Sequence, residues 1–480
     1  MVETTLIRNA AWVIAWDGDA GEHLYLNDAD VVFEGNLITH VGPGYAGEAD
    51  RVIQGKGLLV MPGLVDIHSH PANEPMSQGI NEELGSPRLY NSSLYEYMPL
   101  FKADDDGLKA AATVAYAELL MSGTTTLVDL SIPYDGWLEL MAQSGLRGVL
   151  SPMYRSASWS TSNGYTVEYL WDQVAGREAM AQAMEVVDNA LKHPSARLSG
   201  QLCPAQVDTC TPELLQASQD EARKRGLTMQ VHAAQSQVEF NEMTQRHGVT
   251  PIQWLDALGV LDHDTTIGHG IYLDHHSCLD WYTKKDLGIL ARNQCSVAHC
   301  PNVFSRRGMK LEHFGAYHDA GVNLGIGTDT YPHNMIEELR SAIIFGRLAS
   351  GEIRPSTAEV FNAATVGGAK ALGRKDIGRL TPGAKADVVL VDLERPAMKP
   401  CREPLRSLIY VAAERAVRDV FVDGRQVVRQ GRVMNLDYAS AKDALEQAQK
   451  RSLEGMQALD FASRTPEEIS PLTFSKRSKA

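Results

Sequence analysis

The chain has 480 residues, of which 44% are hydrophobic, 22% charged and 7% aromatic. This is the composition of an ordinary globular protein, and the length allows a large buried core without disulfides as staples. Lys and Arg number 45 against 60 Asp and Glu, which gives a formal net charge of −15 at pH 7. Such an acidic balance argues against nucleic acid or an anionic membrane surface as a partner.

The cysteine pattern and the N-terminus indicate a cytoplasmic protein. The six cysteines are widely scattered and include no C-x-x-C pair, which favours reduced thiols over a disulfide framework. The first twenty residues lack the basic region and the continuous apolar region of a signal peptide. No stretch approaches the roughly 18 uncharged apolar residues of a membrane span.

Both ends of the chain predict short strands. Residues 4–60 consist of β-rich runs separated by turn residues, and the same texture returns after residue 377. We therefore expect the two ends to build one β-sandwich, with its first part at 1–61 and its second part at 377–435. Residues 436–480 predict an exposed helix, followed by a frayed tail of sequence SKRSKA.

Between the two sandwich parts, strand-like runs alternate with helical stretches. Eight such runs are found, at 64–70, 124–131, 147–154, 197–205, 227–234, 265–271, 295–301 and 322–330. Eight alternating units predict an α/β fold of the (β/α)8 type, a TIM barrel that spans residues 62–376.

The first of these runs ends in the motif His68-Ser69-His70. Because side chains on a strand alternate between its faces, both imidazoles point to the same side. They also lie at the carboxyl end of the strand, where the active sites of such barrels form. The motif alone fits a pair of surface histidines equally well.

Three further polar residues follow apolar runs in the same way: His232, His269 and Asp329. All would face the same end of the barrel as His68 and His70. Imidazoles together with a carboxylate suit Zn²⁺, Fe²⁺ or Mn²⁺ better than Ca²⁺ or Mg²⁺, which prefer oxygen ligands. The pattern therefore predicts a catalytic metal site.

These motifs, with the segments HCP at 299–301 and GTD at 327–329, resemble the amidohydrolase superfamily. The similarity is to its cytosine deaminase and chlorotriazine hydrolase branch and covers nearly the whole chain. The resemblance implies that His68, His70, His232 and Asp329 bind one divalent metal, with zinc favoured over iron or manganese. It also implies that His269 contacts the bound water or the substrate, and that the protein is a homo-oligomer, a dimer or larger.

The resemblance also implies a mechanism, in which Asp329 takes a proton from the attacking water and later gives it to the leaving group. The alternative role of Asp329 is to cap the following helix. Binuclear members of the superfamily use a carboxylated Lys on an intermediate strand, and neither candidate strand contains one. We therefore expect a mononuclear site.

Two positions depart from the pattern of the deaminases in this branch. The deaminases carry a Glu three residues after the metal-binding His, where this chain has Gln235. They also carry a substrate-contacting His where this chain has Ala205. A Gln amide hydrogen-bonds but cannot deliver a proton.

We therefore expect hydrolysis of a non-peptide C–N bond in a urea, carbamate, amide or guanidine. The alternative is an aminohydrolase or dechlorinase that acts on a nitrogen heterocycle such as a triazine, purine or pyrimidine. Glu239 is expected to be a solvated helix residue.

The long connection after His70 has the size of a lid and offers Tyr97 and Met98 as contacts for a small-molecule substrate. His299 and His333 flank the expected active-site entrance and are further substrate candidates. The remaining alternative is a scaffold protein without catalytic activity, although the four expected metal ligands and His269 are all present.

Overall fold

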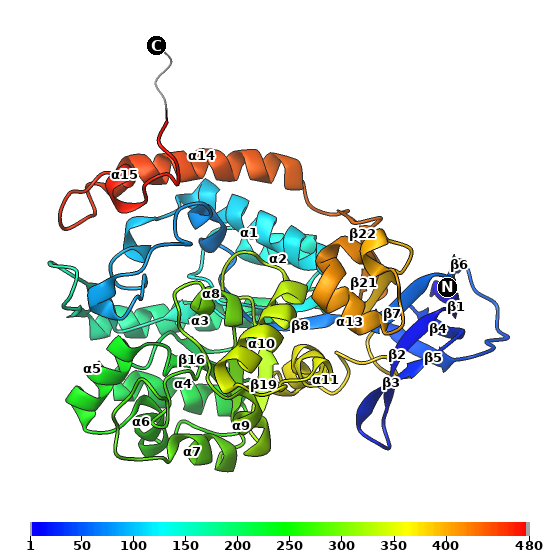
Figure 1. The fold of residues 1–480 in the computed structure, drawn as a ribbon, viewed down its shortest axis with the longest axis horizontal. Helices are drawn as coiled ribbons and strands as arrows, with labels where there is room; N and C mark the ends of the chain where they lie inside the picture. Colours follow the sequence, from blue (N-terminus) through cyan, green and yellow to red (C-terminus); the bar gives the residue numbers. More distant parts are fainter. Residues whose placement is uncertain (1, 477–480) are drawn as a thin grey trace.

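A computed structural model describes residues 2–476 of the chain, which form an α/β fold. An α/β body occupies most of the molecule, and a β-sheet region lies at one end of it (Figure 1). None of the helices described is both long enough and apolar enough to cross a lipid bilayer. All six cysteines lie within the described residues and are unpaired. Of the SKRSKA tail, residues 477–480 lie outside the described part.

Each of the eight expected runs contains a strand. The strands are β8 (Leu64–Ser69), β9 (Thr124–Asp129), β10 (Arg147–Leu150), β14 (Ser199–Gly200), β16 (Met229–Ala233), β17 (Thr265–His269), β18 (Ser296–His299) and β19 (Asn323–Ile326). They form two four-stranded parallel sheets, in the orders β14-β10-β9-β8 and β16-β17-β18-β19. Parallel bridges join Leu202 to Met229 at one pair of edges and Ser69 to Asp329 at the other.

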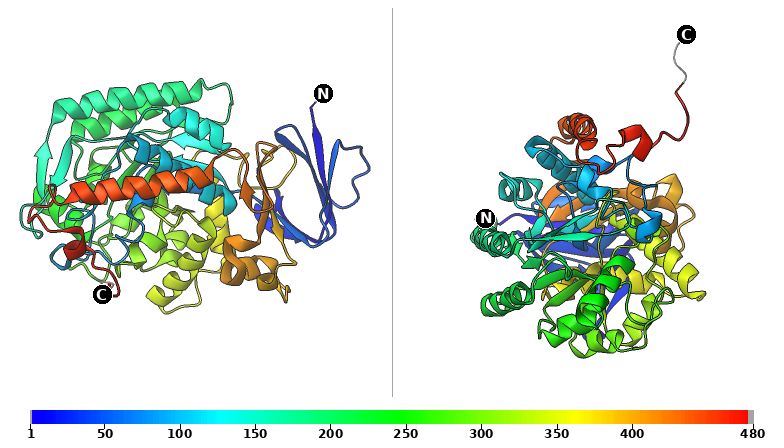
Figure 2. Two further views of the ribbon diagram at one scale, coloured as in Figure 1. Left: turned by 90° about the horizontal axis from the view of Figure 1, so that it is seen from above. Right: turned by 90° about the vertical axis from the view of Figure 1, so that its left-hand side faces the viewer.

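Helices follow most of these strands and lie around the outside of the two sheets (Figure 2). They are α1 (Asp105–Met121), α2 (Trp137–Ser144), α3 (Gln173–Leu191), α4 (Pro212–Arg225), α5 (Gln237–His247), α6 (Pro251–Ala257), α7 (Asp286–Arg292), α8 (Pro301–Ser305), α9 (Phe314–Asp319), α10 (Met335–Ser350), α11 (Thr357–Asn362) and α12 (Gly368–Ala371). Several begin at a residue whose side chain accepts a backbone N–H, as Thr211 does for α4 and Asn334 for α10. Asp329 is therefore not the cap of the helix that follows it.

Short elements lie in the connections of this body. They are the strand pairs β11 (Met153–Tyr154) with β15 (Cys203–Pro204) and β12 (Ala157–Ser160) with β13 (Glu168–Trp171), and the 3-10 helices η1 (Glu74–Ser77), η2 (Pro87–Leu89) and η3 (Met98–Leu100). The three 3-10 helices belong to the connection after His70, which we call the lid (residues 71–104).

Both chain ends contribute to the β-sheet region. A seven-stranded sheet has the order β23-β22-β21-β20-β7-β2-β3, in which β7 pairs antiparallel with β20. Its strands are β2 (Trp12–Asp17), β3 (Glu22–Leu26), β7 (Leu58–Pro62), β20 (Val388–Asp392), β21 (Val417–Val422), β22 (Arg425–Arg429) and β23 (Arg432–Val433). A four-stranded sheet of N-terminal strands contains β1 (Thr4–Ala10), β4 (Ala29–Glu34), β5 (Leu37–Gly42) and β6 (Arg51–Gln54). One hydrophobic cluster contains Ile7 and Phe33 from this sheet together with Val388 and Phe421 from the other, so the sheets pack on each other.

The C-terminal segment lies over the lid. After α13 (Pro404–Ser407) and the sheet strands, α14 (Tyr438–Met456) runs along α1, and α15 (Pro466–Ile469) follows it (Figure 1). One face of α14 is buried through Ala448 and Met456. The Gln449 side chain donates to the carbonyl oxygen of Met76 at 2.7 Å, so this helix holds the lid as well as covering α1.

A buried ion pair connects the α/β body to the β-sheet region. Arg147 on β10 donates to both carboxylate oxygens of Asp387 at 3.0 and 2.9 Å, and to Asp423 at 3.0 Å. The side chains of Arg147 and Asp387 are only 3% and 2% exposed.

Replacing Asp387 with Ala should lower the free energy of unfolding by about 3–5 kcal/mol, because Arg147 loses its bidentate partner while it stays buried. Thermal and denaturant unfolding followed by circular dichroism measure the loss. Glu394→Ala, which breaks a solvent-exposed pair with Lys399, is the matched control and should cost less than about 1 kcal/mol. Equal effects of the two substitutions would contradict a stabilising role of the buried pair.

Candidate metal centre

Five of the sequence-predicted residues meet at the carboxyl ends of the parallel strands. His68 and His70 come from the end of β8, His232 from β16, His269 from the end of β17, and Asp329 follows β19. The ring centroid of His68 lies 5.2 Å from that of His70, 4.7 Å from that of His232 and 4.5 Å from that of His269. Side chains separated by up to 261 residues in the sequence are thus neighbours.

Hydrogen bonds fix how three of the imidazoles are oriented. Nδ1 of His70 lies 2.7 Å from the carbonyl oxygen of Leu130, and Nδ1 of His232 lies 2.7 Å from that of Ala205. A carbonyl only accepts, so both Nδ1 atoms carry the proton. The Nε2 atoms of these two rings are then left as lone-pair donors.

His68 is held in the same way by a side chain. Its Nδ1 lies 2.5 Å from Oε1 of Gln230, while Nε2 of Gln230 donates to the Ile67 carbonyl oxygen and to Gln201. The amide oxygen of Gln230 is therefore an acceptor for Nδ1–H, and Nε2 of His68 also keeps a lone pair. Partners of this kind commonly orient metal-binding histidines.

The free donor atoms converge as ligands of one cation do. Nε2 of His70 lies 3.3 Å from Nε2 of His232, and Oδ1 of Asp329 lies 3.4 Å from Nε2 of His68 and 3.3 Å from Nε2 of His70. Tetrahedral ligands at the usual zinc–nitrogen distance are separated by about 3.3 Å. Nε2 of His68 is also buried without a hydrogen-bond partner. Facing lone pairs repel unless a cation lies between them, so this donor set fits a divalent metal.

Backbone hydrogen bonds hold Asp329 against the H-x-H motif. Its N–H donates to the carbonyl oxygen of His68 at 2.8 Å, and its own carbonyl accepts from the N–H of His70 at 2.8 Å. Burial alone would raise the pKa of Asp329, but the surrounding imidazoles of His269, His68 and His70 outweigh it and hold that pKa well below its usual range. The carboxylate is therefore ionised and available as a ligand and proton acceptor.

His269 completes the cluster in its neutral form. Burial lowers the pKa of His269 well below its usual range, and the neighbouring His68 lowers it further. Its Nδ1 has no hydrogen-bond partner, and its ring packs edge-on against Phe304 at a centroid distance of 4.5 Å. A neutral imidazole in this position can donate a hydrogen bond to a developing negative charge.

Glu239 is not the solvated residue that the sequence suggested. It is fully buried, and its carboxylate accepts from the N–H of Ala234 at 2.6 Å and of Gln235 at 3.1 Å. Burial, reinforced by the carboxyl of Asp208, raises the pKa of Glu239 well above its usual range. The error came from reading helix position alone: α5 turns this side chain back toward the loop after β16. Glu239 thus fixes the backbone that presents Gln235, whose Nε2 is buried without a partner.

The lid is hydrogen-bonded to two of the loops that follow the strands of the cluster. The Tyr331 hydroxyl donates to the Ser77 carbonyl oxygen at 3.0 Å, and Tyr95 and Ser236 share a hydrogen bond of 2.7 Å. Glu74 is buried near His70, and burial raises its pKa to about 7. These contacts hold the lid against the loops that follow β16 and β19.

The four substrate candidates fall in different surroundings. Tyr97 packs against the C-terminal segment, with the Arg464 guanidinium 5.7 Å from its ring centre, and the partly exposed Met98 begins η3 of the lid. His299 packs its ring against Phe314, and burial lowers its pKa to about 4. His333 is fully buried, neither ring nitrogen has a partner, and burial lowers its pKa to about 3.

Sequence reasoning did not single out Gln230. A signal was present, since Gln230 lies two residues before His232 on the same strand and so faces the same side. Replacing Gln230 with Leu should weaken metal binding by about 10–100-fold, because His68 loses the acceptor that fixes its tautomer. Competition with a chromogenic chelator measures the affinity. Gln216→Leu, at an exposed side chain on α4, is the control, and equal affinities for the two variants would contradict the orienting role.

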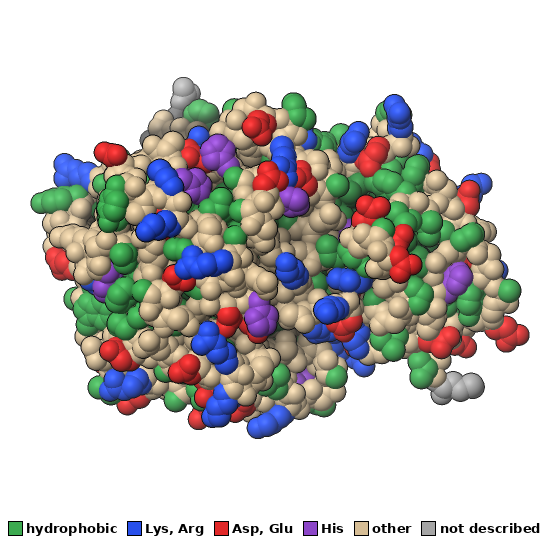
Figure 3. Space-filling model, turned by 90° about the horizontal axis from the view of Figure 1, so that it is seen from below, with side chains coloured by type: hydrophobic (Ala, Val, Ile, Leu, Met, Phe, Trp, Pro, Cys, Tyr) green, Lys and Arg blue, Asp and Glu red, His purple; other side chains and the backbone are tan. Residues whose placement is uncertain are grey.

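A separate cavity lies at the opposite ends of the strands. It has a volume of about 780 Å³, and its lining includes His263 before β17 and Asn323 at the start of β19. Its lining does not include any of the five clustered residues. Figure 3 shows Lys, Arg, Asp and Glu side chains interspersed over the lower face of the molecule. The convergent donor atoms, and not the cavity volume, mark the candidate centre.

The amidohydrolase family model matches residues 59–427, most of the chain. The chain belongs to the amidohydrolase family. Among its relatives, a 5-methylthioadenosine/S-adenosylhomocysteine deaminase from Pelotomaculum thermopropionicum is 28% identical over 457 residues, which cover 93% of this amidohydrolase and 98% of the relative. A 5'-deoxyadenosine deaminase from Methanosarcina acetivorans is 28% identical over 437 residues and covers 90% and 94%.

Solved structures of the same fold include zinc-containing enzymes. An adenosine deaminase from Xanthomonas campestris with bound zinc superimposes with a TM-score of 0.78 at 23% identity, covering 93% of this amidohydrolase and 98% of that chain. Atrazine chlorohydrolase from Arthrobacter aurescens TC1, complexed with zinc, gives a TM-score of 0.79 at 22% identity and covers 93% and 100%. At these identities the similarity concerns the fold. The expected resemblance to the amidohydrolase superfamily is confirmed.

Proposed function

We propose that this protein is a metal-dependent hydrolase that cleaves a non-peptide C–N bond at a trigonal carbon of a small nitrogen heterocycle. The observation that carries the proposal is the convergence of His68, His70, His232 and Asp329, with three Nε2 lone pairs and one carboxylate oxygen directed at a common point. The curated relatives, which are named as deaminases of adenine nucleosides, support the heterocyclic substrate.

The four residues would hold one divalent ion, zinc by preference and iron or manganese as alternatives. Such an ion would supply a hydroxide nucleophile at neutral pH, because it lowers the pKa of water to about 7. Asp329, ionised and next to this position, accepts the proton of the nucleophile and returns it to the leaving group. His269 donates a hydrogen bond to the negative charge that develops on the heteroatom bound to the attacked carbon, and the lid excludes bulk water.

A second candidate substrate class is the urea, carbamate, amide or guanidine type. Gln235 and Ala205 favour it, because neither side chain supplies the proton or the imidazole that ring deamination uses in related enzymes. In both cases Gln235 is proposed to orient the substrate through its unpaired Nε2 atom, with His299, His333, Tyr97 and Met98 as the other substrate contacts.

We further propose that the two parallel sheets form one (β/α)8 barrel at residues 62–376. The bridges at both pairs of sheet edges support this closure. The packed sheets would then be a β-sandwich built from residues 1–61 and 377–435, with residues 436–480 as the C-terminal helix and tail. A cytoplasmic homo-oligomer remains part of the proposal, and light scattering after size-exclusion chromatography tests the oligomeric state.

Purified protein should contain about one tightly held divalent ion per chain, because four donors are already oriented for it. Removal of the ion by a chelator should abolish hydrolysis, and zinc should restore it. Metal analysis is paired with a kinetic panel of purines, pyrimidines, triazines, ureas, amides and guanidines. A protein that binds no ion, or that hydrolyses its substrate equally well after chelation, would contradict the proposal.

A further inference from the structure

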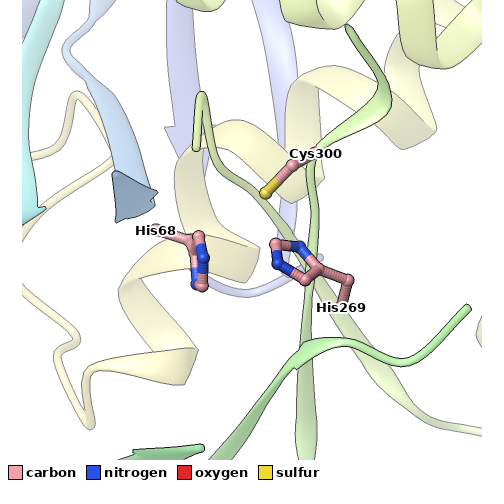
Figure 4. A group of neighbouring side chains, drawn as sticks. All are labelled: His68, His269 and Cys300. Carbon is pink, nitrogen blue, oxygen red and sulfur yellow. The ribbon is translucent and has the colours of Figure 1, made fainter. Parts of the chain in front are cut away.

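The thiol of Cys300 is directed at the imidazoles of the cluster. Cys300 follows β18, and its sulfur points toward the rings of His68 and His269 (Figure 4). One possible ligand atom from each of the three residues lies within 4.8 Å of the other two. Their exposed fractions are 1% for Cys300, 0% for His68 and 2% for His269. The three side chains thus form a compact and buried group of nitrogen and sulfur donors.

Each of these side chains has unused bonding capacity. Nε2 of His68 and Nδ1 of His269 are buried and have no hydrogen-bond partner. The Cys300 thiol donates to the carbonyl oxygen of Ala298 over a long distance of 3.9 Å. Buried polar atoms without partners are costly, and a bound cation would satisfy them.

We propose that His68, His269 and Cys300 form a second metal position, which takes a thiophilic divalent cation such as Cd²⁺ and excludes the catalytic ion when it is filled. His68 belongs to both donor sets, and Nε2 is the one ring nitrogen that the hydrogen bond between Nδ1 and Gln230 leaves free for a metal. One ion can therefore use it at a time, and the two positions are alternatives and not a binuclear centre.

Ligand chemistry separates the occupants of the two positions. Three imidazoles and a carboxylate suit zinc, whereas a thiolate with two imidazoles favours a softer ion. When Cd²⁺ binds, the S–H bond of Cys300 is broken, a Cd–S bond forms, and the proton leaves to the solvent with no change of oxidation state. Because Cd²⁺ then occupies His68 and His269, which the proposed hydrolysis uses, Cd²⁺ at this position inhibits the enzyme.

The test is the ultraviolet absorption of Cd²⁺–thiolate bonds as excess Cd²⁺ displaces zinc from the zinc-loaded protein, with the released zinc measured in the same titration. All variants carry Cys278→Ser, because Cys278 is an exposed thiol that would bind Cd²⁺ on its own. We expect a charge-transfer band that saturates at one Cd²⁺ per chain. The band should be absent in Cys300→Ser and retained in Cys203→Ser, a matched control at another fully buried thiol.

A band that persists in Cys300→Ser, or that never forms in the Cys278→Ser parent, overturns the inference. If Cys300→Ser does not give the circular dichroism spectrum of the parent, Cys300→Ala replaces it. The absence of the band in the Cys278→Ser parent would overturn the inference whether or not these variants fold. The absorption band does not depend on turnover. It therefore tests Cd²⁺ binding at Cys300 even if the proposed hydrolase activity is wrong. For the active enzyme, Cys300→Ser should raise the Cd²⁺ concentration for half inhibition by at least about tenfold.

Discussion

Replacing Asp329 with Asn should lower kcat by about a thousandfold or more while the protein stays folded. The amide keeps the size of the side chain but neither carries the negative charge nor accepts the proton of the nucleophile. Electrostatic stabilisation by such a centre contributes several kcal/mol, and each 1.36 kcal/mol corresponds to a factor of ten in rate. Steady-state kinetics, metal analysis and circular dichroism on the same preparation measure the three quantities separately.

The separate readouts distinguish the roles of Asp329. Loss of both the ion and activity indicates that the carboxylate is mainly a ligand, whereas a retained ion with lost activity indicates that it mainly moves protons. Asn334→Ala is the matched control, since it removes the true cap of α10 from the same loop. That substitution should cost about 1 kcal/mol of stability and leave the rate within a few-fold. An Asp329→Asn variant that keeps its kcat would rule out Asp329 as the catalytic carboxylate.

The grouping of the candidate metal ligands could be predicted, because each of them lies at or just after the end of a predicted strand. His68, His70, His232 and His269 lie within or just beyond strands, and the carboxyl ends of parallel strands meet at one edge. Local periodicity and a polar residue at the end of an apolar run are sufficient for that inference. The same reasoning identified the α/β fold, because each of the eight expected runs contains a strand.

The surroundings of these residues could not be predicted, because they depend on side chains that reach across the fold. Glu239 resembles an exposed helix residue in the sequence, yet it is buried and bonds backward to the loop before α5. Cys300 follows a histidine at the end of β18, and only the folded chain brings its thiol to His68 from β8 and to His269 from β17. Tyr97 stays a proposed substrate contact, and nothing in the sequence indicated that its aromatic ring also packs against Arg464, 367 residues away in sequence.

Replacing Gln235 with Glu should raise the rate of ring deamination by about 10²–10⁴-fold, the usual contribution of a positioned general acid. Gln235 is 5% exposed and its Nε2 has no hydrogen-bond partner, so this position has surroundings of low dielectric constant. The carboxyl of the substituted Glu would therefore keep its proton at neutral pH. Such a carboxyl can protonate a ring nitrogen as the adjacent carbon is attacked. The amide cannot.

The measurement is kcat/KM of both proteins on a purine and on a simple urea. An increase in kcat/KM for the purine alone would show that Gln235 is the residue that prevents protonation of the substrate ring in the natural protein. Glu239→Gln is the control, because it changes the buried carboxyl that accepts from the Gln235 N–H without adding an acid at position 235, so it should not raise either rate. Efficient purine deamination by the natural protein would show that its heterocycle chemistry does not need an acid at this position, and would leave Gln235 as an orienting group alone.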